Sequence, residues 1–170
     1  LAGLDGIYIT GTVVAATSLE IDLPDNPISL YSDSPVDTAG LALTLDSGSA
    51  IIIGNPSTSS SVYLSSLSLN SGTLAVVYPG GTNTLVLGDL TISGSSGNWT
   101  GQLDLEDNDL ILRNGDMPTT LDQVRAGYNA GAWTGKGIIS TAAAASNGVT
   151  AIGLMLGSDI DGSRFDGITL

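Results

Sequence analysis

The chain has 170 residues, of which 42% are hydrophobic and only 12% are charged, and 17 acidic residues against four basic ones give a net charge of −13. Because the chain has no basic stripe and no apolar run of about 18 residues, we expect no nucleic-acid partner and no membrane insertion. The absence of Cys and His excludes disulfides, thiol chemistry, the commonest general base and the commonest zinc ligand.

Residues 1–17 predict a strand that leads into the rest of the chain. Its apolar positions are Ile7, Ile9, Val13 and Val14. This segment contains no lysine and no predicted helix that would block pairing with another strand. We therefore expect these four side chains to form an assembly contact with a neighbouring copy of the chain.

An apolar/polar alternation then recurs at an even interval. It starts at Leu19, Leu43, Leu67 and Leu90, which are 24, 24 and 23 residues apart. A fixed period of about 20–30 residues with strand-type alternation is typical of a solenoid. We predict an all-β fold, a parallel β-helix (β-solenoid) of about four coils, in which the four leucines occupy equivalent positions and face the core. The turn-rich residues 24–40 predict its least regular connection.

The pattern changes after residue 115, which divides the chain into β-solenoid repeats with their lead strand (1–115) and a C-terminal cap (116–170). The cap is expected to contain one short helix near 119–127. Thr119 or Thr120 can cap this helix, Asp122 lies in its expected first turn, and Gly127 can end it. Residues 151–156 predict an apolar strand.

Two aromatic residues, Tyr128 and Trp133, follow the predicted helix among glycines. Such a pair can close the open end of a core or can stack a sugar, and we favour the first role for these two residues. Arg125 is expected to fix the cap to backbone carbonyls or to an acid.

Two acidic groups are candidate cation sites, with Ca²⁺ as the candidate ion because carboxylates are its preferred ligands. Asp104 and Glu106 alternate with leucines and are expected to point to one face of a strand. They suit a solvated face, a Ca²⁺ site or a glycosidase-type carboxylate pair, and the solvated face is favoured. Asp159, Asp161 and Asp166 resemble a calcium loop, but the glutamate at its twelfth position is missing. They suit a loop with incidental acids or a loose Ca²⁺ site, and the first is favoured.

The C-terminal third carries a recognisable string of residues. It includes Arg125 to Asn129, Gly131, Trp133, Gly137 to Ser140, and Thr150 to Gly153. Residues 100–170 resemble a block found in secreted planctomycete-type proteins, where it closes a region of autotransporter-associated β-strand repeats and usually precedes a dockerin-like segment. The resemblance implies a secreted, bacterial cell-surface or extracellular-matrix protein on a β-solenoid, with no assigned catalysis.

These observations favour a non-enzymatic, acidic extracellular structural protein that self-associates into filaments or a surface or matrix layer, with itself as the main partner. No catalytic residue is assigned. The alternative is a β-helix polysaccharide-binding module or a polysaccharide lyase or hydrolase, with extracellular polysaccharide as the partner. A binding module would use aromatic side chains from Tyr63, Tyr78, Trp99 and Trp133.

Overall fold

A computed structural model of the chain describes residues 18–21, 28–30, 40–46, 48, 50–54 and 60–170. The predicted assembly residues Ile7, Ile9, Val13 and Val14 lie outside these described residues, as does most of the connection at 24–40. The fold described below is that of the remaining segments.

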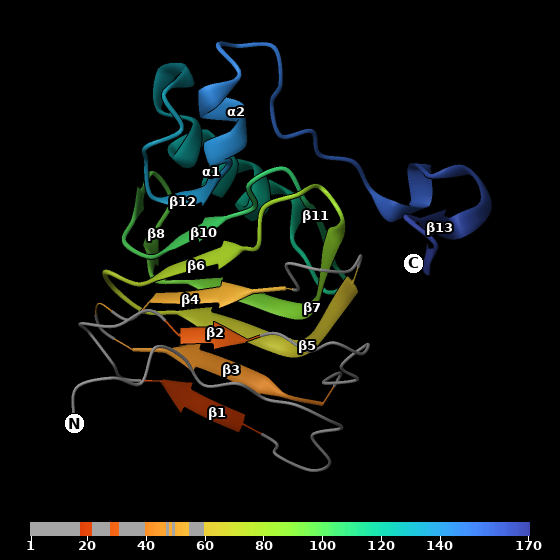
Figure 1. The fold of residues 1–170 in the computed structure, drawn as a ribbon, viewed down its shortest axis with the longest axis horizontal. Helices are drawn as coiled ribbons and strands as arrows, with labels where there is room; N and C mark the ends of the chain where they lie inside the picture. Colours follow the sequence, from red (N-terminus) through yellow and green to blue (C-terminus); the bar gives the residue numbers. More distant parts are fainter. Residues whose placement is uncertain (1–17, 22–27, 31–39, 47, 49, 55–59) are drawn as a thin grey trace.

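Two parallel sheets form the main body of the described chain (Figure 1). Sheet A, in spatial order, consists of β1 (Ser18–Ile21), β3 (Ala42–Leu45), β5 (Ser60–Leu69), β7 (Asn83–Ile92) and β11 (Asp109–Leu112). Sheet B consists of β2 (Ile28–Leu30), β4 (Ala50–Ile53), β6 (Leu74–Val77), β10 (Gln102–Asp104) and β12 (Gly137–Ile139). From β1 to β7 the chain alternates between the sheets and advances by one strand at each return. This mostly β arrangement is consistent with a short β-solenoid.

The strand pairing confirms the predicted register of the repeat. Leu19 pairs with Leu43, Leu43 with Leu67, and Leu67 with Leu90. Leu43 and Leu67 are fully buried in the cluster formed by inward side chains of both sheets, and Leu90 is half-buried against the same cluster. The repeat therefore places like side chains above one another in the core, as stacked parallel strands require.

The polar residue that follows each Leu-x-Leu or Leu-x-Ile triad belongs to a column across the C-terminal ends of the strands of sheet A. Asn70 Nδ2 donates a hydrogen bond to Asp46 Oδ1 at 2.5 Å, and Ser93 Oγ donates to Asn70 Oδ1 at 3.4 Å. A second column lies elsewhere on the fold, where the side-chain amides of Asn83 and Asn108 both donate to the carbonyl of Tyr78. These columns satisfy polar groups where the chain turns from one strand to the next.

The predicted short helix is present, but its ends differ from those expected. Helix α1 spans Met117–Tyr128, and its N-cap is Asp116, whose carboxylate accepts a hydrogen bond from Thr119 N at 3.0 Å. The capping role predicted for Thr119 or Thr120 was therefore wrong, and Asp122 lies beyond the first turn. The helix ends where Asn129 adopts a left-handed conformation, φ 41°, which asparagine tolerates well.

The prediction that Gly127 ends α1 was wrong, because the helix continues to Tyr128. Gly127 instead permits close packing of α1 on β12. A Cβ added to Gly127 would lie 2.0 Å from the carbonyl oxygen of Ile138, and one added to Gly137 would lie 2.3 Å from that of Gln123. Both distances are too short for any side chain. These two glycines thus let the helix backbone rest directly on the last strand of sheet B.

The remaining elements are short. They are the hairpin of β8 (Gly94–Ser95) and β9 (Asn98–Trp99), the 3-10 turn η1 (Asn129–Gly131), helix α2 (Thr141–Ala145), the turns η2 (Gly157–Asp159) and η3 (Asp161–Ser163), and the hairpin of β13 (Arg164–Phe165) and β14 (Ile168–Thr169). We call residues 149–156 the linker and residues 157–170 the C-terminal lobe. The strand predicted at 151–156 was wrong, because the linker has no strand partner in the described chain. No helix in the described segments is long and apolar enough to cross a membrane.

Candidate functional site

Asp104 is a buried structural acceptor at the end of β10. Its Oδ1 accepts hydrogen bonds from the backbone N–H groups of Glu106 at 2.9 Å and Thr141 at 3.0 Å, and its Oδ2 accepts from the Thr141 hydroxyl. The neighbouring Ser140 caps α2 and donates its hydroxyl to the carbonyl of Glu106 at 2.5 Å. Both carboxylate oxygens of Asp104 are therefore used to tie the start of α2 to sheet B.

Glu106 does not share a strand face with Asp104, because β10 ends at Asp104 and Glu106 has a φ of 52°. The expected alternation is broken by this turn. Burial, followed by the nearby charges of Asp104 and Asp107, raises the pKa of Glu106 above its ordinary value. A carboxylate pair of glycosidase type needs two free carboxyl groups across an open groove. The engaged oxygens of Asp104 do not provide such a pair.

The loop that follows Asp104 is held to the preceding coil by its polar side chains. Asp107 Oδ1 accepts a hydrogen bond from Gly80 N at 2.8 Å, and Asn108 Oδ1 accepts from Asn83 N at 3.0 Å. Asp107 is exposed. Asp107 and Asn108 thus join neighbouring turns of the chain.

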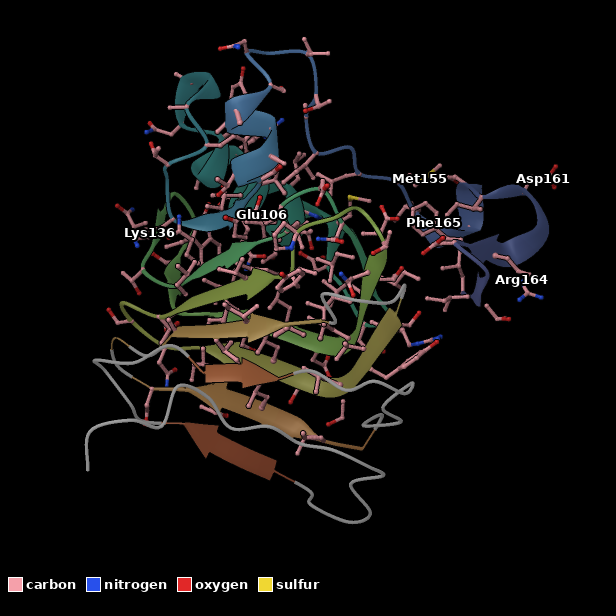
Figure 2. All side chains as sticks on the ribbon, in the orientation of Figure 1. Glu106, Lys136, Met155, Asp161, Arg164 and Phe165 are labelled. Atoms are coloured by element: carbon pink, nitrogen blue, oxygen red, sulfur yellow. The ribbon has the colours of Figure 1, made fainter. Side chains whose placement is uncertain are left out.

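The three C-terminal acids do not form one cluster in the described part of the chain. Asp159 and Asp161 are exposed in the C-terminal lobe, whereas Asp166 Oδ2 accepts a hydrogen bond from Thr84 Oγ1 on β7 at 2.5 Å. Figure 2 places Glu106 in the main body and Asp161 in the lobe. Asp109 is close enough to Asp166 that its pKa is raised, first by burial and then by that charge. Among the described residues, no three acidic side chains form a group that could hold a metal ion, and the predicted Ca²⁺ site stays a prediction.

Trp133 lies in the core beneath the end of α1. It is 5% exposed, belongs to the main hydrophobic cluster, and packs edge-to-face on Tyr128 with ring centroids 5.1 Å apart. Tyr128 is 46% exposed and covers it from outside. A ring buried to this extent closes the core and has no free face on which to stack a sugar.

Asp122 holds α1 to the β8–β9 hairpin, a role that the sequence did not indicate. Its Oδ2 accepts hydrogen bonds from Gly97 N and from the indole N–H of Trp99, both at 2.9 Å. These bonds, with a smaller contribution from exposed Arg125, lower the pKa of Asp122. The sequence feature that could have indicated this role is Trp99, because the N–H group of a part-buried indole needs a hydrogen-bond acceptor.

The outer face of sheet A carries a second apolar cluster that the sequence analysis also missed. Tyr63, Val86 and Ile111 lie side by side on β5, β7 and β11, since Tyr63 pairs with Val86 and Val86 with Ile111. Side chains of the C-terminal lobe cover them, and these are Phe165, Ile168 and Leu170. The sequence feature that could have indicated this cluster is the unbroken apolar run from Leu110 to Leu112, because such a run is typical of a strand that is covered on both faces.

Hydrogen bonds secure this docking of the lobe. Besides the Thr84–Asp166 bond, Arg113 Nη2 donates to the carbonyl of Thr169 at 3.2 Å. The four aromatics proposed for a sugar surface have separate surroundings. Tyr63 lies under the lobe, Tyr78 is half-buried directly after β6, Trp99 is held by Asp122, and Trp133 is buried.

Comparisons of the chain with protein-family models, with curated proteins and with solved structures found no match. The resemblance of residues 100–170 to the planctomycete-type block stays a prediction. Function is therefore argued from the fold and from the side chains described above.

Proposed function

We propose that this chain is a non-enzymatic extracellular structural protein that self-associates into filaments or a surface or matrix layer. The proposed fold is a parallel β-helix of about four coils, with residues 116–170 as its cap. The observation that carries the proposal is the in-register stacking of parallel strands that ends, within the described chain, at β1 and β2. Each of these two strands pairs on one side only with another described strand.

An edge strand offers a row of backbone donors and acceptors to any strand that can reach it. Leaving such groups buried and unpaired costs about 1–3 kcal/mol each. We propose that the segment containing Ile7, Ile9, Val13 and Val14 forms the contact between copies at this end. Repetition of the same contact gives a head-to-tail filament, because it joins two different surfaces of the molecule.

The outer surface of sheet A beyond the cluster of Tyr63, Val86 and Ile111 suits close packing of copies. Its outward positions repeat small hydroxyl residues, with Thr44 paired to Ser68 and Ser68 paired to Thr91. Such side chains lose little conformational entropy when they are covered, in contrast to Lys and Glu. The net charge of −13 makes neighbouring copies repel, so assembly is expected to tighten with Ca²⁺ or added salt.

The proposal assigns no chemistry. Asp104 has both oxygens engaged in structural hydrogen bonds, and the sequence has no His to act as a general base. The resemblance of residues 100–170 to the planctomycete-type block supports an extracellular location. Extracellular polysaccharide fits this setting as a further partner.

Negative-stain electron microscopy of the full chain, with and without Ca²⁺, tests the proposal. Filaments or lattices are expected with the native sequence, and the double variant Ile7→Asp/Ile9→Asp should abolish them. The matched control Ser71→Asp/Ser95→Asp adds the same charge at two exposed positions outside the proposed contacts and should assemble like the native chain. Uniform small particles at every concentration, together with turnover of a polyuronide, would refute the proposal.

A further inference from the structure

The linker presents an apolar strand-like sequence to solvent. Val149 is 84% exposed, Met155 57%, Leu156 49% and Leu154 37%. Ile152, by contrast, is half-buried and packs against the main core, so it anchors the linker near its start. Figure 2 shows Met155 where the linker meets the C-terminal lobe. Four exposed large apolar side chains in eight consecutive residues are unusual for a surface with no partner.

The backbone of the linker is equally available. Within the described part of the chain, the N–H groups of residues 151–156 donate no hydrogen bond to protein. Ile152, Leu154 and Leu156 alternate with Ala151, Gly153 and Met155, which is the period of a β-strand. The Leu154–Leu156 triad also repeats the Leu-x-Leu pattern of Leu43–Leu45 in sheet A. The segment thus has the side chains and the free backbone groups of a strand that lacks its neighbour.

Charge indicates which neighbour it takes. No charged residue lies between Lys136 and Asp159, so in a chain of net charge −13 this is where two copies can approach with least repulsion. Small residues, Ala151 and Gly153, alternate with large ones and leave room for a facing strand. We infer that the linker pairs with the linker of a second copy to form a two-stranded β-ribbon about a twofold axis.

The same charges fix the direction of pairing. A parallel ribbon would bring the exposed acids Asp159 and Asp161 of both C-terminal lobes together at one end. An antiparallel ribbon separates the two lobes to opposite ends, and its hydrogen bonds run perpendicular to the strands. The expected dimer is therefore antiparallel. Because only about eight residues per copy take part, it belongs with small, transient interfaces.

This dimer goes beyond the proposed filament contact, because it uses a different segment and does not depend on the N-terminal strand. Sedimentation equilibrium of the full chain carrying Ile7→Asp/Ile9→Asp, which removes the proposed filament contact, tests it without interference from polymers. The expected mass rises with concentration from 17.1 kDa toward twice that value. A mass that stays at the monomer value up to submillimolar concentration would overturn the inference and leave the filament proposal untouched.

A second pair of variants in the same background separates pairing from charge. Leu154→Asp/Met155→Asp should weaken dimerisation at least tenfold, and both positions are exposed enough that folding is retained. The matched control Thr91→Asp/Ala144→Asp adds the same charge at two other exposed positions and should dimerise like its parent. Equal dimerisation of both double variants would overturn the inference.

Discussion

Replacing Leu67 with alanine tests the stacked core directly. The side chain is 0% exposed and lies between Leu43 and Leu90 in register. The substitution removes three carbons, which at about 0.8 kcal/mol each gives about 2.4 kcal/mol of lost burial. The cavity left among neighbours that cannot close it raises the expected cost to about 3–5 kcal/mol. Urea denaturation followed by tryptophan fluorescence measures this change as a lower midpoint at constant slope.

Leu90→Ala is the matched control, because Leu90 occupies the same register position on the next strand but is only half-buried. Its expected cost is about 1–2 kcal/mol, in proportion to the smaller area removed from water. Equal costs for the two variants would mean that register alone, and not enclosure between the two sheets, determines the contribution of these leucines. Leu67→Asp should abolish folding, since it would bury an unpaired carboxylate.

Three further predictions concern the C-terminal third. Gly127→Ala should destabilise the protein by more than about 2 kcal/mol, because the new Cβ would meet the Ile138 carbonyl at 2.0 Å. Circular dichroism during thermal unfolding measures this destabilisation. An unchanged midpoint would contradict the close packing of α1 on β12. In a Trp99→Phe variant, the remaining Trp133 should emit at short wavelength and resist quenching by acrylamide, whereas emission like that of free indole would refute its burial. Asp122→Asn should destabilise the protein at pH 7, and the difference should begin to shrink as the pH falls below 3.8 and vanish once it is below the lowered folded-state pKa. The sign follows because a carboxyl whose folded-state pKa is lowered contributes stability above its unfolded pKa and loses it on protonation; a difference that stays constant with pH would exclude this cause.

The register of the sheets was predictable because the repeat is carried by core side chains. Leu43 and Leu67 recur at the period of one turn of the chain, and any shift by one residue would turn them to solvent. Short apolar triads of this kind leave few alternative pairings. The sequence therefore fixes which residues stack without any knowledge of the connections between them.

The site residues were harder to predict, because their roles depend on contacts between distant segments. Asp104 and Glu106 follow a strand-like alternation, yet the chain turns immediately after Asp104 so that its carboxylate can meet Thr141 on α2. Gly127 has the residue type of a helix end, but its position is required by the Ile138 backbone that lies against it. Both errors arise because local patterns do not record which backbone will approach from elsewhere in the fold.

The column of Asp46, Asn70 and Ser93 has a direction. Asp46 only accepts, Asn70 donates to it and accepts on its other side, and Ser93 donates to Asn70. Duplicating the repeat that ends in Asp46 would place carboxylate against carboxylate, with no donor between them. The leucines beneath are interchangeable, but this column is not, and it limits how a chain of this kind can lengthen by repeat duplication. New repeats that carry Asn at this position can be inserted anywhere in the stack, whereas those that carry Asp are tolerated only at its end or beside a donor.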